Sequence, residues 1–70
     1  MTFKEQIGFA IAAARKEKKW EQRELAEKAG FSRVYINNIE NGSANFTADA
    51  LEKICKALKV TVCLQGVVSK

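Results

Sequence analysis

The sequence contains no histidine and no proline, and it has two cysteines, Cys55 and Cys63. Histidine is the commonest general base of enzymes, and no glycine-rich phosphate loop or carboxylate pair replaces it, so catalysis is the least expected function. A structural zinc site needs about four ligands, so cysteine and histidine cannot build one, and no metal or other cofactor is expected. The cysteines are expected to be reduced and mostly buried thiols, with a disulfide left open.

The sequence also has no long apolar run. Apolar and polar residues are mixed from the N-terminus onward, which is unlike a signal peptide or a membrane span, so we expect a cytoplasmic protein. Seventy residues can build one small core, and help from oligomerisation would be unsurprising. Twelve Lys and Arg against eight Asp and Glu give a net charge of +4. That balance fits a polyanionic partner without requiring one.

Apolar periodicity and capping residues predict four helices. They are expected over residues 3–18 behind a Thr2–Glu5 capping box, over 22–28 before Gly30, from Ser32 to Asn41–Gly42, and after Thr47. Trp20 is expected to pack on the core from the connection after the first helix.

After residue 59 the period of the sequence changes. Val60, Val62 and Leu64 alternate with polar or small residues, which predicts a strand. We therefore divide the chain into a helical domain, 1–59, and a C-terminal strand or tail, 60–70. A strand needs a partner, so it could fray, fold back after Gly66, or pair with a second copy of the chain.

Residues 22–41 carry the pattern of a helix-turn-helix, with Gly30 in the turn and a small Ala26 that permits close approach. Four apolar positions are spaced to meet in one core: Leu25, Phe31, Ile36 and Ile39.

The third helix has a polar edge opposite Ile36 and Ile39. At 100° per residue this edge spans roughly 140°, and it contains Arg33, Val34, Asn37, Asn38 and Asn41. Arginine suits guanine, asparagine suits adenine and valine suits a thymine methyl, so the edge is suited to reading DNA bases. Taken alone, it would more often be an ordinary solvated helix face.

Two segments, GFAIAAARKEKKWEQRELAEKAGFSRVYINNIENG and ALEKICKALKV, carry a family resemblance over about residues 7 to 60. The chain resembles the lambda-repressor-like, Cro and Xre-type helix-turn-helix domains. The resemblance implies an all-α, compact domain of four to five helices. It also implies binding to double-stranded operator DNA, usually as a homodimer, and commonly repression of transcription.

The resemblance and the polar edge together give the expected site. Base readout is expected from Arg33, Val34, Asn37 and Asn38. Contacts with the DNA backbone are expected from Gln22, Arg23, Ser32, Tyr35, Asn41 and Lys19. Arg15 and Glu40 match a partly buried ion pair of the family, which ties the first helix to the third.

The tail resembles the terminal strand of Cro-like proteins and of certain antitoxins, in which strands of two copies join. We therefore expect a dimer interface at Val60, Val62 and Leu64. An antitoxin that also binds a toxin protein is one alternative. A protein-binding adaptor without DNA readout is another, and Glu21 and the uncharged SANF loop favour it.

Overall fold

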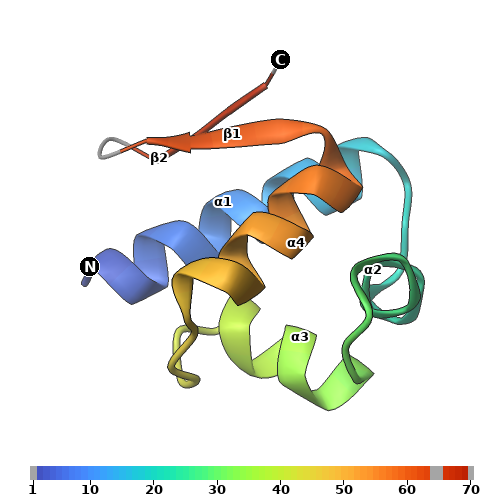
Figure 1. Ribbon diagram of the computed structural model, residues 1–70, viewed down its shortest axis with the longest axis horizontal. Coiled ribbons are helices and arrows are strands. Elements are labelled where there is room, and N and C mark those ends of the chain that lie inside the picture. Colours follow the sequence, from blue (N-terminus) through green and yellow to red (C-terminus); the bar gives the residue numbers. More distant parts are fainter. Residues whose placement is uncertain (1, 64–65, 70) are drawn as a thin grey trace.

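The computed structural model describes residues 2–63 and 66–69, with side chains described over residues 2–59. In these residues the chain forms four helices and then a β-hairpin (Figure 1). The elements are α1 (Phe3–Glu17), α2 (Gln22–Ala29), α3 (Arg33–Glu40), α4 (Ala48–Leu58), β1 (Val60–Cys63) and β2 (Gly66–Ser69). The described helices include none that is long and apolar enough to cross a bilayer.

The helices begin at the capping residues that the sequence predicted. Thr2 Oγ1 accepts the main-chain N–H of Glu5 at 3.2 Å, and Glu5 Oε1 accepts that of Thr2 at 2.8 Å. The hydrogen bond from the Thr2 main chain lowers the pKa of the Glu5 carboxyl. At α4, Thr47 Oγ1 accepts the N–H of Ala50 at 3.0 Å. Side-chain oxygens thus satisfy donors that a helix leaves unpaired in its first turn.

One core joins all four helices. Its fully buried large side chains are Ile7, Ile11, Leu25, Ile36, Ile39, Ile54 and Leu58. Trp20 and Phe31 are half-buried and pack against this cluster, as the sequence predicted. Because every helix contributes to the cluster, the position of α3 is fixed by packing rather than by its short connections alone.

Gly8 sets the approach of α1 to α3. A Cβ atom added to Gly8 would lie 2.7 Å from the main-chain oxygen of Glu40 and closer still to that of Ile39. Only glycine permits this contact without movement of the backbone. The last turn of α3 is therefore seated directly on the main chain of α1.

The C-terminal strand finds its partner within the chain. β1 pairs with β2 in antiparallel register, from Val60 opposite Ser69 to Cys63 opposite Gly66. The sequence left open a fold-back after Gly66, and the chain does fold back, but β2 begins at Gly66. The expected pairing of β1 with a second copy of the chain is therefore wrong for the edge of β1 that β2 occupies. Leu64, one of the predicted interface residues, lies outside the described residues.

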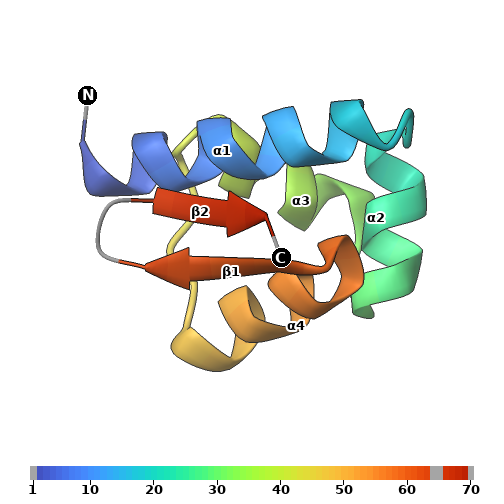
Figure 2. The ribbon, with the colours of Figure 1, turned by 90° about the horizontal axis from the view of Figure 1, so that it is seen from above.

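The hairpin lies on the opposite side of the molecule from α3 (Figure 1). Seen from above, β1 runs beside α4 and β2 beside α1 (Figure 2), and both pairs are in contact. The hairpin thus covers α1 and α4 and leaves the α2–α3 side of the helical body uncovered.

Candidate nucleic-acid interface

The turn between α2 and α3 is held by main-chain hydrogen bonds. Gly30 has a φ of +83°, a conformation that costs glycine nothing. The N–H groups of Gly30 and Phe31 both donate to the oxygen of Ala26 at 2.8 Å. Ser32 Oγ then accepts the N–H of Tyr35 at 3.1 Å and caps α3. The direction of α3 relative to α2 is therefore set by local contacts as well as by the core.

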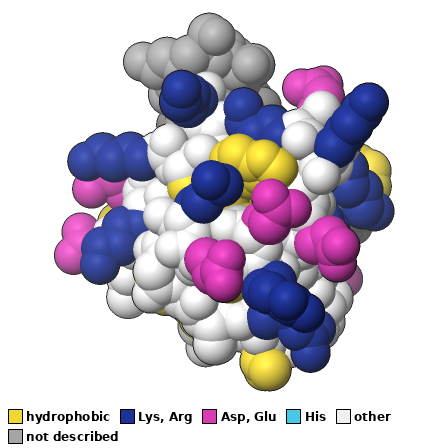
Figure 3. All heavy atoms as spheres, turned by 90° about the vertical axis from the view of Figure 1, so that its right-hand side faces the viewer, with side chains coloured by type: hydrophobic (Ala, Val, Ile, Leu, Met, Phe, Trp, Pro, Cys, Tyr) yellow, Lys and Arg dark blue, Asp and Glu magenta, His cyan; other side chains and the backbone are white. Residues whose placement is uncertain are grey.

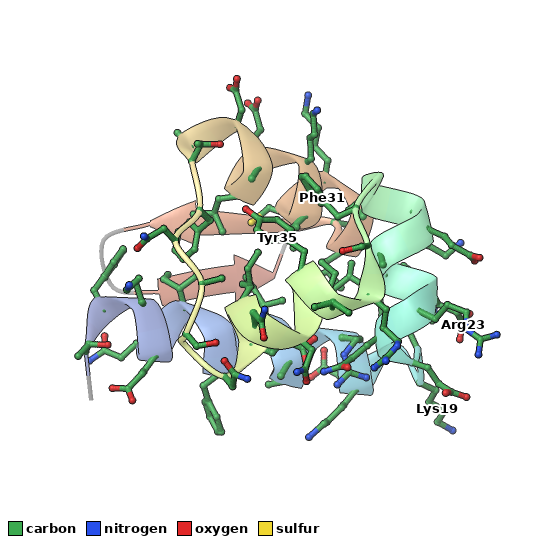
Figure 4. The ribbon with its side chains drawn as sticks, turned by 90° about the horizontal axis from the view of Figure 1, so that it is seen from below. Lys19, Arg23, Phe31 and Tyr35 are labelled. Atoms are coloured by element: carbon green, nitrogen blue, oxygen red, sulfur yellow. The ribbon has the colours of Figure 1, made fainter. Side chains whose placement is uncertain are left out.

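The outer edge of α3 faces solvent. Arg33 and Asn37 are exposed, Val34 is 60% exposed, and Asn38 is half-buried. Ile36 lies on the opposite edge and is fully buried. Figure 4 looks at the molecule from below, where α3 lies in front of the hairpin. The four residues expected to read bases are thus brought together on one side of the molecule.

The inner edge of α3 carries the ion pair that the resemblance implied. Arg15 Nε and Glu40 Oε2 are 2.7 Å apart, and Arg15 Nη2 donates to Glu40 Oε1 at 3.0 Å. Arg15 Nη1 donates to the main-chain oxygen of Trp20 at 2.7 Å. The two charged side chains are only 10% and 7% exposed. One guanidinium thus connects α1, the loop after it and α3.

Gln22 extends this network to α2. Its side-chain nitrogen, Nε2, donates to Glu40 Oε1 at 3.0 Å and to Asn37 Oδ1 at 3.1 Å. Both N–H bonds of the amide are therefore used within the protein. The phosphate contact expected from Gln22 would have to come from its main-chain N–H in the first turn of α2. No pattern in the sequence indicates the bond to Asn37, because this bond joins residues on two different helices.

Asn41 has a similar internal contact just beyond α3. Its Oδ1 accepts the main-chain N–H of Ser43 at 3.0 Å and the hydroxyl of Ser43 at 2.6 Å. The main-chain oxygen of Asn38 also accepts the N–H of Ser43 at 2.9 Å. These bonds, with Gly42 at a φ of +80°, hold the loop against the end of α3.

The comparisons with known proteins agree with this geometry. A model of the helix-turn-helix family matches residues 11–64. The chain belongs to that helix-turn-helix family. The membership confirms the resemblance that the sequence indicated.

Two relatives and one solved structure illustrate what this helix-turn-helix domain is similar to. The immunity repressor protein of Bacillus phage phi105 is 43% identical over 56 residues, which are 80% of this chain and 39% of the repressor. Antitoxin HipB of Escherichia coli (strain K12) is 34% identical over 59 residues, 84% of this chain and 67% of the antitoxin. The crystal structure of the restriction-modification controller protein C.Esp1396I matches with a TM-score of 0.80 and 39% identity, over 87% of this chain and 82% of that one. The helix-turn-helix chain thus spans about two fifths of the length of the phage repressor.

The cations around the helix-turn-helix are interspersed with acids. Lys19 and Arg23 are exposed and point away from the body at the same end of the molecule (Figure 4). Arg23 lines a shallow hollow with Glu21 and Glu24, and Figure 3 shows charges of both signs on this side. Glu24 Oε1 accepts the main-chain N–H of Glu21 at 3.3 Å, at the start of α2. This side of the domain therefore has no uniform positive field.

Two further residues, Tyr35 and Cys55, are in contact mainly with other residues of the domain. Tyr35, a predicted contact for the DNA backbone, is half-buried with its ring centre 5.0 Å from that of Phe31. The two rings lie close to one another in Figure 4. Cys55 is a free, buried thiol, and burial raises its pKa, which makes it a poor nucleophile. The described residues include no group of three or more potential metal ligands.

Proposed function

We propose that the chain is a sequence-specific DNA-binding regulator of transcription, which represses a promoter by binding a near-palindromic operator as a homodimer. The observation that carries this proposal is the outer edge of α3. It presents Arg33, Val34 and Asn37 to solvent on a helix whose inner edge is fixed to α1 and α2. A helix that is anchored on one side and exposed on the other fits a DNA major groove.

The exposed side chains have the chemistry of base recognition. Arg33 can donate two hydrogen bonds to O6 and N7 of guanine, and Val34 can contact a thymine methyl group. These two residues begin α3, and the first residues of a recognition helix reach the base edges. Asn38 lies about one turn further along and would contact a neighbouring base pair.

We expect phosphate contacts from several groups around the edge of α3 that is proposed to read bases. The first turn of α2 offers the main-chain N–H groups of Gln22 and Arg23, which precede the first intrahelical hydrogen bonds, and the positive end of the helix dipole. Lys19 and Arg23 add charge at the same end, and the amide nitrogen of Asn41 can donate because its oxygen is already used by Ser43. Ser32 would contribute its hydroxyl group, and Tyr35 would do so in place of the 3.5 Å hydrogen bond that its hydroxyl donates to the main-chain oxygen of Asn45.

Two of the similar proteins support the proposal. The phi105 protein is an immunity repressor, and C.Esp1396I was also solved as a tetramer in complex with its natural 35 base-pair operator. For this chain we infer two copies whose α3 helices lie about one DNA turn apart, roughly 34 Å. Sedimentation of the purified chain at micromolar concentration tests the homodimer, which a monomer would exclude.

Selection of bound duplexes from a random pool, repeated at two salt concentrations, tests the DNA-binding function. We expect a near-palindromic consensus and an affinity that falls steeply with salt, because phosphate contacts release counterions. A pool without enrichment would reject the proposal. Weak binding that ignores salt would favour the protein-binding adaptor, for which the acidic residues around Arg23 are the best support.

An antitoxin is a second candidate function, because Antitoxin HipB is 34% identical to this chain over 59 residues, which are 84% of this chain. Such a protein would bind its own promoter and also mask a toxin protein. Isolation of the chain from its native cell, followed by identification of any protein bound at one-to-one stoichiometry, distinguishes the two. Recovery of the chain with DNA alone would favour the repressor.

A further inference from the structure

We propose that Lys4, which is held by Asn45, supplies a phosphate contact beside the loop after α3. That loop, residues 43–46, is the SANF segment and has no cation of its own. This inference rests on the proposed DNA-binding function and adds to it a DNA contact from the first turn of α1.

The loop offers few groups of its own to a phosphate, because its first main-chain donors are used inside the protein. The N–H groups of Ser43 and Ala44 both donate to the main-chain oxygen of Asn38, at 2.9 and 3.2 Å. The N–H of Gly42 donates to the oxygen of Ile39 at 3.1 Å. A phosphate beside this loop would therefore need a donor from another part of the chain.

Lys4 brings such a donor to the loop from the start of the sequence. Its Nζ donates to Asn45 Oδ1 at 2.9 Å, although the two residues are 41 positions apart. An ammonium group has three N–H donors, and the amide oxygen that directs it here is neutral. Among residues 2–59, whose side chains are described, no carboxylate forms an ion pair with Lys4. The neighbouring Glu5 is turned toward the main-chain N–H of Thr2, so the charge of Lys4 remains available to an anion.

The contact between Lys4 and Asn45 lies on the flank of α3 away from the start of α2. Asn37 accepts from Gln22 of α2, whereas the hydroxyl of Tyr35 donates to the main-chain oxygen of Asn45 at 3.5 Å. Tyr35 and Asn37 are two residues apart, which is about 200° around a helix, so they face nearly opposite sides. Seen from below, α2 and the loop after α3 lie at opposite ends of α3 (Figure 4). A major groove has a sugar–phosphate ridge on each side, so α2 and Lys4 would contact different ridges.

The helix dipole argues against a purely structural role for Lys4. Lys4 is the second residue of α1, where the positive end of the dipole disfavours a cation. The bond to Asn45 also restricts the lysine side chain before DNA arrives, so less side-chain entropy is lost on binding. The same bond thus places the charge and lowers the cost of using it.

Lys4→Gln tests the phosphate contact, because it removes the charge and keeps a polar side chain. The slope of log affinity against log salt should become less steep by about 0.9 units, since one phosphate contact is lost. The loss should be the same on every duplex, because a phosphate contact carries no base information. Lys56→Gln is the matched control, since it removes the same charge from an exposed position on α4. Equal changes of slope in the two variants would overturn the inference.

Asn45→Lys tests where the charge acts. In the Lys4→Gln background it returns a cation to the loop, so it should restore about 0.9 units of slope. In the unmodified background it should add clearly less, because Lys4 already occupies the site and two ammonium groups repel each other. An equal gain in both backgrounds would mean that Lys4 acts elsewhere, and the inference would be wrong.

The same titrations separate this inference from the proposed function. If the unmodified chain binds its selected duplex with a steep salt dependence and Lys4→Gln keeps that slope, the inference fails and the DNA-binding function stands. A chain that binds no duplex would reject both. Lys4→Arg keeps the charge and should keep the slope, so a slope lost in Lys4→Arg would assign the effect to packing and also overturn the inference. Circular dichroism of each variant checks that its helical content is unchanged.

Discussion

Both edges of α3 carry polar side chains, yet these side chains differ in where their hydrogen bonds go. On the inner edge, Glu40 accepts from Arg15 and Gln22 and is almost fully buried. On the outer edge, Arg33 and Val34 are exposed to solvent. Polarity alone therefore does not identify a recognition surface. The distinction lies in whether a polar group already has partners inside the protein, and each prediction below tests that distinction.

Loss of Glu40 should have the largest effect. Glu40→Ala leaves the guanidinium of Arg15 buried without its carboxylate, and removal of one partner of a buried pair costs about 3–5 kcal/mol of folding free energy. Chemical denaturation followed by circular dichroism measures the loss. The double variant Arg15→Met, Glu40→Leu is the control, and it should recover most of the stability because no charge is left unpaired. An unchanged midpoint in Glu40→Ala would contradict the role of the inner edge.

A methyl group at Gly8 should destabilise the domain by forcing α3 away from α1. Overpacking of this kind costs about 1–3 kcal/mol, whereas helix propensity alone would make Gly8→Ala stabilising by about 1 kcal/mol. The sign of the change in unfolding free energy therefore decides between the two effects. Ala13→Gly, at an exposed position of α1, measures the propensity term separately.

Arg33→Ala should affect recognition and leave folding nearly unchanged. We expect a loss of about 1–3 kcal/mol of binding free energy on the preferred duplex and relaxed preference at one base pair. The unfolding free energy should stay within about 0.5 kcal/mol of the original, since the side chain is exposed. Competition between duplexes that differ at single positions measures the first effect. An equal loss on every duplex would instead assign Arg33 to the phosphate backbone.

Two lysines in the left-handed conformation provide the smallest and most closely matched test. Lys19 and Lys59 have φ values of +61° and +59°, which a residue with a Cβ atom adopts at a cost of about 1 kcal/mol. Glycine at either position should therefore raise the unfolding free energy by about that amount. Only Lys19→Gly should also reduce the salt dependence of DNA binding, by about one unit of slope. A similar reduction in Lys59→Gly would argue against the proposal that DNA binds on the α2–α3 side of the domain.

The helices and the ion pair were predictable from the sequence because their signals are local or shared with the family. Thr2, Ser32 and Thr47 occupy cap positions whose chemistry depends on three or four neighbouring residues. The pairing of Arg15 with Glu40 came from the family resemblance, and the ion pair is present.

The remaining features depend on contacts between elements that a sequence pattern does not encode. An alternating pattern identifies β1 as a strand but does not say which strand will pair with it. A glycine inside a helical pattern, such as Gly8, can indicate close packing, but the pattern does not say which helix packs against it. The bond from Gln22 to Asn37 required the relative position of two helices, which the sequence alone does not give.

The placement of the hairpin opposite α3 restricts how two copies can cooperate on one duplex. If two copies packed against each other through their hairpins, their α3 helices would face in opposite directions. Such a dimer would bind two separate DNA duplexes and hold them near each other. Only copies arranged shoulder to shoulder, with a shared two-fold axis perpendicular to the duplex, would aim both helices at the same operator.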